Sequence, residues 1–321
     1  MKDRGSFGLV RPPRSCSQRD FECRRQRPKV SITASYARGL FLNGRDRAII
    51  RFVSEIGYAT TRQLRRLFWD DNAPRAAAER LLELWRLWVL DRQPFFRLSD
   101  YGLRPQLVYM LGRAGVKMMR DLDDNVTRRR GTLLMPHNVL LCEALVRLVE
   151  AARATNRQHN LNFYGEAVSR ATFKWDGQWI KMRPDGLIDL QLEGQDLPFY
   201  VEFDRNTRPI SHFSGKVKQY GLYRRSKEWK SRYSVFPGIL VIVWSKYQVD
   251  GLSEDEAADR RGGRVQRRLD GIIKHLQSAT RDPALRWFCQ RLDLVGKAPW
   301  HVVTADGLKR APAFFTHKGH R

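Results

Sequence analysis

Apolar residues recur at helical spacing three times in the first third of the chain and then begin to alternate with polar residues. Thr60 or Thr61 suits the start of the second helix, and Pro74 suits the start of the third. A turn over 101–105 separates the two alternating segments. Three helices followed by a strand pair are the element order of a winged helix-turn-helix domain. The elements predicted in this way are helices over about 45–56, 61–67 and 74–88 and strands over 89–98 and 106–111.

Arginine is concentrated on those faces of the second and third predicted helices that the apolar residues leave free. In a winged helix the third helix enters the major groove of duplex DNA while the wing touches the backbone. We therefore expect this segment to bind double-stranded DNA, although units of three helices also bind other proteins. The residues expected to contact DNA are Arg62, Arg65, Arg66, Arg75, Arg80 and Arg86.

The remainder of the chain mixes helix and strand patterns. A helix is predicted over 136–154, and residues 238–245 are almost continuously apolar, as is typical of a buried central strand. Residues 251–263 indicate a mobile loop, 264–278 a basic helix and 300–304 a final edge strand. The sequence thus predicts an α/β (α+β) protein whose second domain is a mixed sheet with flanking helices. Four further strands are expected over 171–175, 179–182, 186–192 and 199–203.

Composition divides the chain into two domains with basic flanks. The first 44 residues hold ten Lys or Arg against three acids and show no sustained apolar period, which predicts a flexible arm. An acidic patch followed by Arg128-Arg129-Arg130 indicates a junction between the domains. The expected division is an arm over 1–44, a winged helix over 45–112, a linker over 113–131, a second domain over 132–308 and a basic tail over 309–321.

The charge balance indicates a polyanionic partner. The 321 residues carry 59 Lys and Arg against 34 Asp and Glu, a formal net charge of +25 at pH 7. Neutralising nucleic-acid phosphates releases counterions and so favours a basic surface, whereas the longest apolar run is too short to cross a bilayer. The N-terminus does not have the pattern of a secretory signal. We therefore expect a cytoplasmic, nucleoid-associated protein that does not bind membranes.

Cysteine and histidine give little sign of a metal site. The four cysteines form no Cys-x-x-Cys pair, and no histidine is placed to complete a zinc site with them. Neither disulfides nor structural zinc are therefore expected. His137, His212 and His301 are isolated in the sequence and are interpreted as hydrogen-bonding or surface residues, not as ligands.

Three acidic residues stand out against this basic background. Asp185 begins a predicted strand, and Glu202 and Asp204 end another, where their spacing of two places both side chains on one face. If the two strands are neighbours, the three carboxylates converge, and a bound Mg²⁺ or Mn²⁺ would relieve their repulsion through hard oxygen ligands. The alternative is a surface network in which Glu202 and Asp204 pair with Arg183, Arg205 and Arg208.

These residues resemble a known family. Pro184-Asp185, then Glu202-Phe203-Asp204 after an apolar strand, then a helix with Lys216 and Tyr220 resemble the core of the PD-(D/E)XK nuclease superfamily. The resemblance is closer still to the replication-relaxation family of plasmids and other mobile elements. In that family a winged helix precedes a domain whose signature is an acid pair followed by Arg and Thr. Here that signature is Glu202-Phe203-Asp204-Arg205-Asn206-Thr207.

The resemblance covers about residues 45–310 and implies a nuclease that depends on one or two Mg²⁺ or Mn²⁺ ions. The ions would lower the pKa of a bound water and neutralise charge at the scissile phosphate. The partners it implies are double-stranded DNA and other replication, transfer or transposition proteins of a mobile element. The catalytic and metal-binding residues it implies are Asp185, Glu202, Asp204, Lys216 and, as an outer metal ligand, Glu143.

The chain departs from the nuclease motif at one position, because Asp204 stands where the motif has lysine. Lysine migrates within the superfamily, so Lys216 on the next helix, or alternatively Lys218, is expected to reach the site from the side. Lys216 and Tyr220 are four residues apart and share a helix face. Lys216 would stabilise the transition state or orient the attacking water. Arg205 and Lys218 join the residues expected to contact DNA.

The sequence therefore favours a DNA-binding protein of a plasmid or mobile element that acts as a metal-dependent endonuclease or nickase in replication, relaxation or transfer. The rival hypothesis is a winged-helix accessory factor whose nuclease-like domain is a scaffold without catalytic activity. RNA binding or cleavage is a third hypothesis, disfavoured because the deep major groove of A-form RNA excludes a recognition helix.

Overall fold

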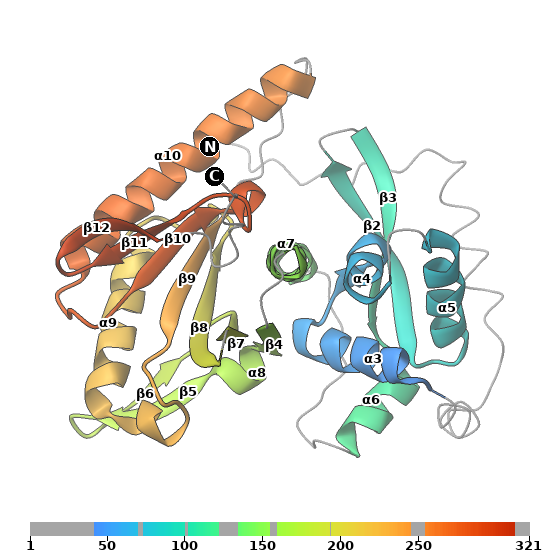
Figure 1. Cartoon of the computed structure of the whole chain (residues 1–321), viewed down its shortest axis with the longest axis horizontal. Coiled ribbons are helices and arrows are strands. Elements are labelled where there is room, and N and C mark those ends of the chain that lie inside the picture. The colour runs from blue at the N-terminus through green and yellow to red at the C-terminus, as the bar shows by residue number, and fades with distance from the viewer. Residues whose placement is uncertain are drawn as a thin grey trace, which may run out of the picture.

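The described part of the chain forms two units with one helix, α7 (Met135–Arg153), between them (Figure 1). Helix and strand are mixed, as the sequence predicts for an α/β protein. The predicted arm over 1–44 lies almost entirely outside the described residues, and so does most of the tail over 309–321. The computed structural model describes residues 42–69, 73–99, 102–121, 134–154, 159–192, 194–244 and 254–311.

The N-terminal unit packs helices against a small antiparallel sheet of order β1-β3-β2. Local signals place its helices: Asn43 and Asp46 form a capping box at the first helix, and Thr60 and Gln63 form one at the second. Its elements are α3 (Gly44–Ile56), β1 (Ala59–Thr60), α4 (Thr61–Phe68), α5 (Pro74–Arg86), β2 (Leu90–Ser99) and β3 (Gly102–Leu111).

The hairpin of this unit is longer than predicted. The turn expected over 101–105 is wrong for most of its length, because β2 and β3 remain paired from Leu90 and Leu111 out to Ser99 and Gly102. Pro105 had indicated a turn, since proline lacks the N–H that a strand ladder uses. In the structure β1 pairs with β3 only near Val108, so Pro105 lies where β3 has a partner on one side alone and a proline is tolerated.

The predicted linker begins with a packed helix. In α6 (Arg113–Arg120) the side chains of Ala114, Val116 and Met119 are buried in the same hydrophobic cluster as Ile49 of α3. The first part of the segment 113–131 is therefore built into the N-terminal unit. The remainder, from residue 122, lies outside the described residues.

The C-terminal unit is a seven-stranded mixed sheet of order β12-β11-β10-β9-β8-β7-β4. The pairs β8/β9 and β9/β10 are parallel, and the other neighbours are antiparallel. The strands of this sheet are β4 (His159–Gly165), β7 (Gly186–Leu192), β8 (Gln195–Asp204), β9 (Gly238–Val243), β10 (Trp287–Arg291), β11 (Trp300–Thr304) and β12 (Gly307–Ala311).

Helices cover both faces of this sheet. Two of them, α9 (His212–Ser226) and α10 (Glu254–Ala279), bury apolar side chains on one face with Tyr200 and Ile239, while α7 packs with the residues of the other face (Figure 1). A short helix, α8 (Glu166–Ser169), follows β4. The hairpin of β5 (Ala171–Trp175) and β6 (Gln178–Met182) forms a separate two-stranded sheet.

Three predictions for this unit are wrong. Helix α10 begins at Glu254, so most of the loop expected over 251–263 is helical; the pair Gly262-Gly263 lowers helix propensity by about 1 kcal/mol per residue, and packing outweighs it. The strand 300–304 exists but is not at the edge, because β12 pairs along its outer side. Lys309 to Ala311 thus belong to the sheet and not to a basic tail.

Helix α7 connects the two units through a continuous core. Its apolar residues, such as Leu141 and Leu145, share one hydrophobic cluster with Val53 of α3 and with strand residues of the large sheet. The contact is also close at the backbone: a Cβ on Gly165 of β4 would lie 2.3 Å from the carbonyl oxygen of Glu55 in α3. The two units therefore pack as one body.

Within the described ranges, every helix is too short or too polar to cross a bilayer.

Candidate active site

A cavity of about 290 Å³ lies where the two units meet α7. Ile56 of α3 and His137 of α7 line it together with Glu166 of α8. Asp185 and Glu202, the first two acids singled out in the sequence, line the same cavity. Residues from both units therefore surround the predicted acid pair.

Strand pairing brings the two acids together. The amide of Asp185 donates to the carbonyl of Val201 at 2.9 Å, which continues the antiparallel ladder between β7 and β8. The Asp185 Oδ2 atom in turn accepts the backbone N–H of Phe203 at 2.7 Å. Asp185 is thus fixed against the backbone on both sides of Glu202.

Glu202 is buried, with 6% of its surface exposed, and holds two donors on the same oxygen. The Lys216 Nζ atom lies 2.9 Å from its Oε1 atom, and the Tyr220 hydroxyl donates to Oε1 at 2.8 Å. Lys216 also donates to the carbonyl of Arg183 at 3.0 Å. Burial raises the pKa of Glu202 to about 7; the charge of Lys216 opposes the rise and that of Asp185 adds to it. Lys216 and Tyr220 of α9 therefore share a face and reach the acid, as the sequence predicted.

Asp185 has the opposite electrostatic balance. Burial acts to raise its pKa, but hydrogen bonds from His137 and the Phe203 amide, together with the charges of His137 and Lys216, hold the pKa below its usual value. The His137 Nε2 atom lies 3.3 Å from Asp185 Oδ1, and its ring meets the Phe203 ring edge-on. His137 is isolated in the sequence, but α7 carries it to an acid 48 positions away in the chain. Its interpretation as a hydrogen-bonding residue holds.

Asp204 lines the cavity but its charge is already paired. Its Oδ2 atom accepts from Arg268 Nε at 2.7 Å and its Oδ1 atom from Arg268 Nη2 at 3.1 Å, and both side chains are more than nine-tenths buried. Arg268 of α10 would therefore compete with any metal ion for Asp204, and the three predicted carboxylates do not form one open cation site. Their cationic partners are Lys216 and Arg268. The alternative prediction, that Glu202 and Asp204 pair with Arg183, Arg205 and Arg208, is wrong in its partners, because Lys216 and Arg268 take that place. Arg183 and Arg208 contribute only backbone carbonyl oxygens, which accept from these two cations.

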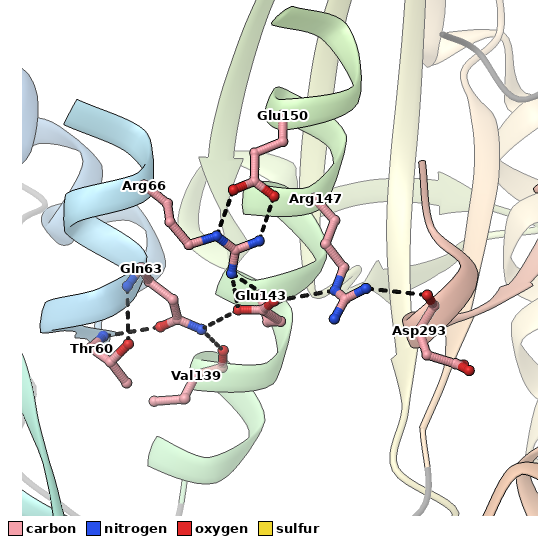
Figure 2. Close-up of polar contacts among 8 residues, drawn as sticks. All are labelled: Thr60, Gln63, Arg66, Val139, Glu143, Arg147, Glu150 and Asp293. Atoms are coloured by element: carbon pink, nitrogen blue, oxygen red, sulfur yellow. Dashed lines mark hydrogen bonds and ion pairs between the residues drawn. The ribbon is translucent and has the colours of Figure 1, made fainter. Parts of the chain in front are cut away.

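Glu143 does not line the cavity. It lies on the side of α7 that faces α4, where its carboxylate accepts from Arg66 at 2.8 Å and from Arg147 at 3.2 Å (Figure 2). The Gln63 amide contacts it from α4, and Arg66 also binds Glu150 two turns further along α7. The structure thus places Glu143 in an ion-pair network between α4 and α7, away from the acid pair.

The residues expected to contact DNA fall into several classes. Arg66 belongs to the network just described, and Arg80 is paired with the buried Asp46 of α3 and with Glu83. The guanidinium groups of both residues are therefore engaged in ion pairs within the protein and are not free to contact DNA phosphates. Arg75 pairs with Glu79 but is 91% exposed, Arg65 is half-buried, and Arg205 lines the cavity. The other exposed members are Arg62, Arg86 and Lys218.

Sequence reasoning missed several residues around the cavity. Glu166 and Glu55 line it, and the Glu55 carboxylate accepts the amide of Gly165 at 2.7 Å. Glu166 follows β4, a strand that the sequence did not predict, and Arg268 lies in a helix 64 residues beyond Asp204. Neither spacing carries a local signal that links these residues to the acid pair.

The acids of the cavity offer a limited set of ligands to a divalent cation. Among the residues that the structure describes, no group of three or more His, Cys, Asp or Glu side chains is close enough to hold a metal ion. Asp185 and Glu202 remain as a pair of hard oxygen ligands. Mg²⁺ commonly binds through one or two carboxylates, substrate phosphates and retained waters, and the pair fits this mode of binding.

Comparison with known proteins identifies the family. The model of the replication-relaxation family matches residues 50–239. The chain belongs to the replication-relaxation family. This match includes the acid pair and Lys216 but ends before Arg268. Searches of curated proteins and of solved structures found no match. Membership of the replication-relaxation family indicates a role in plasmid or mobile-element replication or relaxation.

Proposed function

We propose that this replication-relaxation protein binds duplex DNA with its N-terminal unit and cleaves a phosphodiester bond in the cavity beside α7, with Mg²⁺ or Mn²⁺ as cofactor. Nicking would serve the replication, relaxation or transfer of a plasmid or mobile element. One observation carries the proposal: Asp185 and Glu202 from neighbouring strands line one cavity, with Lys216 bonded to Glu202.

The residues around the acid pair have distinct tasks in this proposal. Asp185 and Glu202 hold the ion, which would supply charge neutralisation at the phosphate and an activated water. The Phe203 amide and His137 orient Asp185, and the Tyr220 hydroxyl orients Glu202. With a cation on Glu202, Lys216 would be available to stabilise negative charge on the phosphate.

The N-terminal unit supports the DNA-binding half of the proposal. Its order of helix, short strand, two helices and hairpin suits a winged helix, in which α5 would enter the major groove and the hairpin would lie along the backbone. Arg86 on α5 and Arg62 on α4 are exposed and available to phosphates. A net charge of +25 supplies the general attraction.

A specific observation favours a second candidate function, a DNA-binding accessory factor without catalytic activity. Asp204 occupies the position of the motif lysine, and Arg268 neutralises it with a bidentate ion pair. A domain that retains the fold and fills its site with internal ion pairs would serve as a scaffold for DNA or for a partner protein.

Plasmid nicking separates the two functions. Supercoiled plasmid incubated with Mg²⁺ or Mn²⁺ should be nicked by the wild type and by Asp196→Ala, an exposed acid at the far end of β8. Glu202→Ala and Glu202→Gln should lose nicking, while all four proteins should still retard DNA on a gel. If wild type and the Glu202 variants are equally inert with every metal, the protein is an accessory factor.

A further inference from the structure

The loop after β8 is held in one conformation by a single guanidinium. Arg268 Nη2 donates to the carbonyl of Arg208 at 2.7 Å, and the same guanidinium binds Asp204 at the other end of the loop. Between them Asn206 has a φ of 56°, in the left-handed region that asparagine tolerates better than most residues. Its amide also donates to Asp204 Oδ1 at 3.3 Å. The loop is therefore pre-organised before any ligand binds.

This loop presents cationic side chains to the cavity that holds the acid pair. Arg205, Thr207 and Arg208 all line the cavity, and so does His212 at the start of α9. Arg208 Nη1 lies 3.2 Å from the His212 Nε2 atom. One wall of the cavity thus carries Asp185 and Glu202, and the loop supplies guanidinium and hydroxyl donors.

The Arg205 guanidinium has a buried donor atom, Nε, that lacks a hydrogen-bond acceptor among the residues that the structure describes. The neighbouring acid, Asp204, is bound by Arg268 and does not neutralise it. Burial accordingly lowers the pKa of Arg205. A buried donor without an acceptor is costly. Arg205 also lines the cavity, where a bound anion would compensate the charge of its guanidinium.

A phosphate is the anion that best matches these donors. The planar guanidinium fork binds phosphate oxygens in pairs, and Arg208 and Thr207 offer further donors on the same loop. Under the proposed function, on which this inference rests, the phosphate that is cleaved would lie at the cation held by the acid pair. We propose that Arg205, Thr207 and Arg208 form a separate subsite for an internal phosphate of the same nucleic-acid strand, next to the phosphate that is cleaved.

The subsite can be tested without metal and without cleavage. Calorimetric titration in the presence of EDTA would use two probes: a short oligothymidylate with hydroxyl groups at both ends, and thymidine 5′-monophosphate. The first offers internal phosphates only and the second a terminal phosphate only. We expect the oligothymidylate to bind and the monophosphate to bind at least about tenfold more weakly.

Variants of two arginines provide the comparison. Arg205→Ala should weaken oligothymidylate binding by about tenfold or more, the loss expected for one hydrogen bond between charged groups. Arg205→Lys should recover part of the affinity, which guards against misfolding of the alanine variant. Arg225→Ala removes an exposed charge that stacks on Trp175 outside the cavity, and it should change the affinity less than twofold.

Equal losses in Arg205→Ala and Arg225→Ala would overturn the subsite, since only general charge would then matter. Binding of the monophosphate as tight as that of the oligothymidylate, and equally sensitive to Arg205, would also overturn it in favour of a terminal-phosphate pocket. The nicking assay is independent of these results. Failure of nicking with intact Arg205-dependent binding would reject the nuclease and retain the subsite, and the reverse pattern would reject the subsite alone.

Discussion

The ion pairs between α4 and α7 predict a large effect for a residue that the sequence assigned to DNA. Arg66 binds Glu143 and Glu150 of α7 and is only 14% exposed (Figure 2). Arg66→Ala would leave two carboxylates of the interface without their shared cation. Loss of one partner of a buried ion pair costs about 3–5 kcal/mol. Because Glu150 is 41% exposed and solvent screens it, we expect a loss of about 2–3 kcal/mol.

Urea unfolding measures this loss as a change in the free energy of unfolding. Arg75→Ala is the matched control, because Arg75 pairs with Glu79 on the same unit but is 91% exposed. An exposed pair of this kind contributes about 0–1 kcal/mol. Equal losses in the two variants would refute the reasoning that burial makes the Arg66 network strong. Duplex DNA affinity, measured on folded Arg66→Ala at low temperature, should fall no more than in the Arg75 control.

Three further outcomes are expected. Arg86→Ala should weaken duplex DNA binding and reduce the slope of log affinity against log salt by about one; an unchanged slope would remove this arginine from the interface. Bonding to Arg66 lowers the pKa of Glu150, so its contribution to stability is present above its ordinary pKa of 4.5 and is lost as pH falls through the lower folded value. The stability difference between wild type and Glu150→Gln should therefore shrink with acidification, and a constant difference would contradict the shift. Arg268→Met should cost about 3 kcal/mol or more in urea unfolding by leaving Asp204 unpaired, and adding Asp204→Leu should restore most of it. A double variant as unstable as the single one would show that the ion pair is not the cause.

The N-terminal unit was predictable because its signals are local. The apolar spacing of α3 and the capping box of Thr60 and Gln63 lie within a few residues of the elements that they specify. The acid pair was predictable for a similar reason, since Asp185 directly precedes one apolar strand and Glu202 lies near the end of the next. Their neighbouring positions then follow from the antiparallel pairing of two strands that succeed each other in the chain.

The partners of these residues could not be predicted in the same way. Long cationic side chains form ion pairs with acids that are distant in the sequence, and the chain has many arginines that could form them. Arg66 meets Glu150 from 84 residues away, and Arg268 meets Asp204 from 64 residues away. Edge strand β4 was not predicted either, because it is rich in polar residues. These contacts depend on tertiary packing, which local patterns do not encode.

The shared helix α7 has a consequence for where a duplex would be broken. A protein whose two halves are joined by a flexible tether samples many separations, and its cuts scatter along the target. Here the shared apolar cluster and the close approach of Gly165 to α3 fix the distance between the two units. Under the proposed function, the number of base pairs between the DNA bound by the N-terminal unit and the nick would therefore be constant from one target to the next.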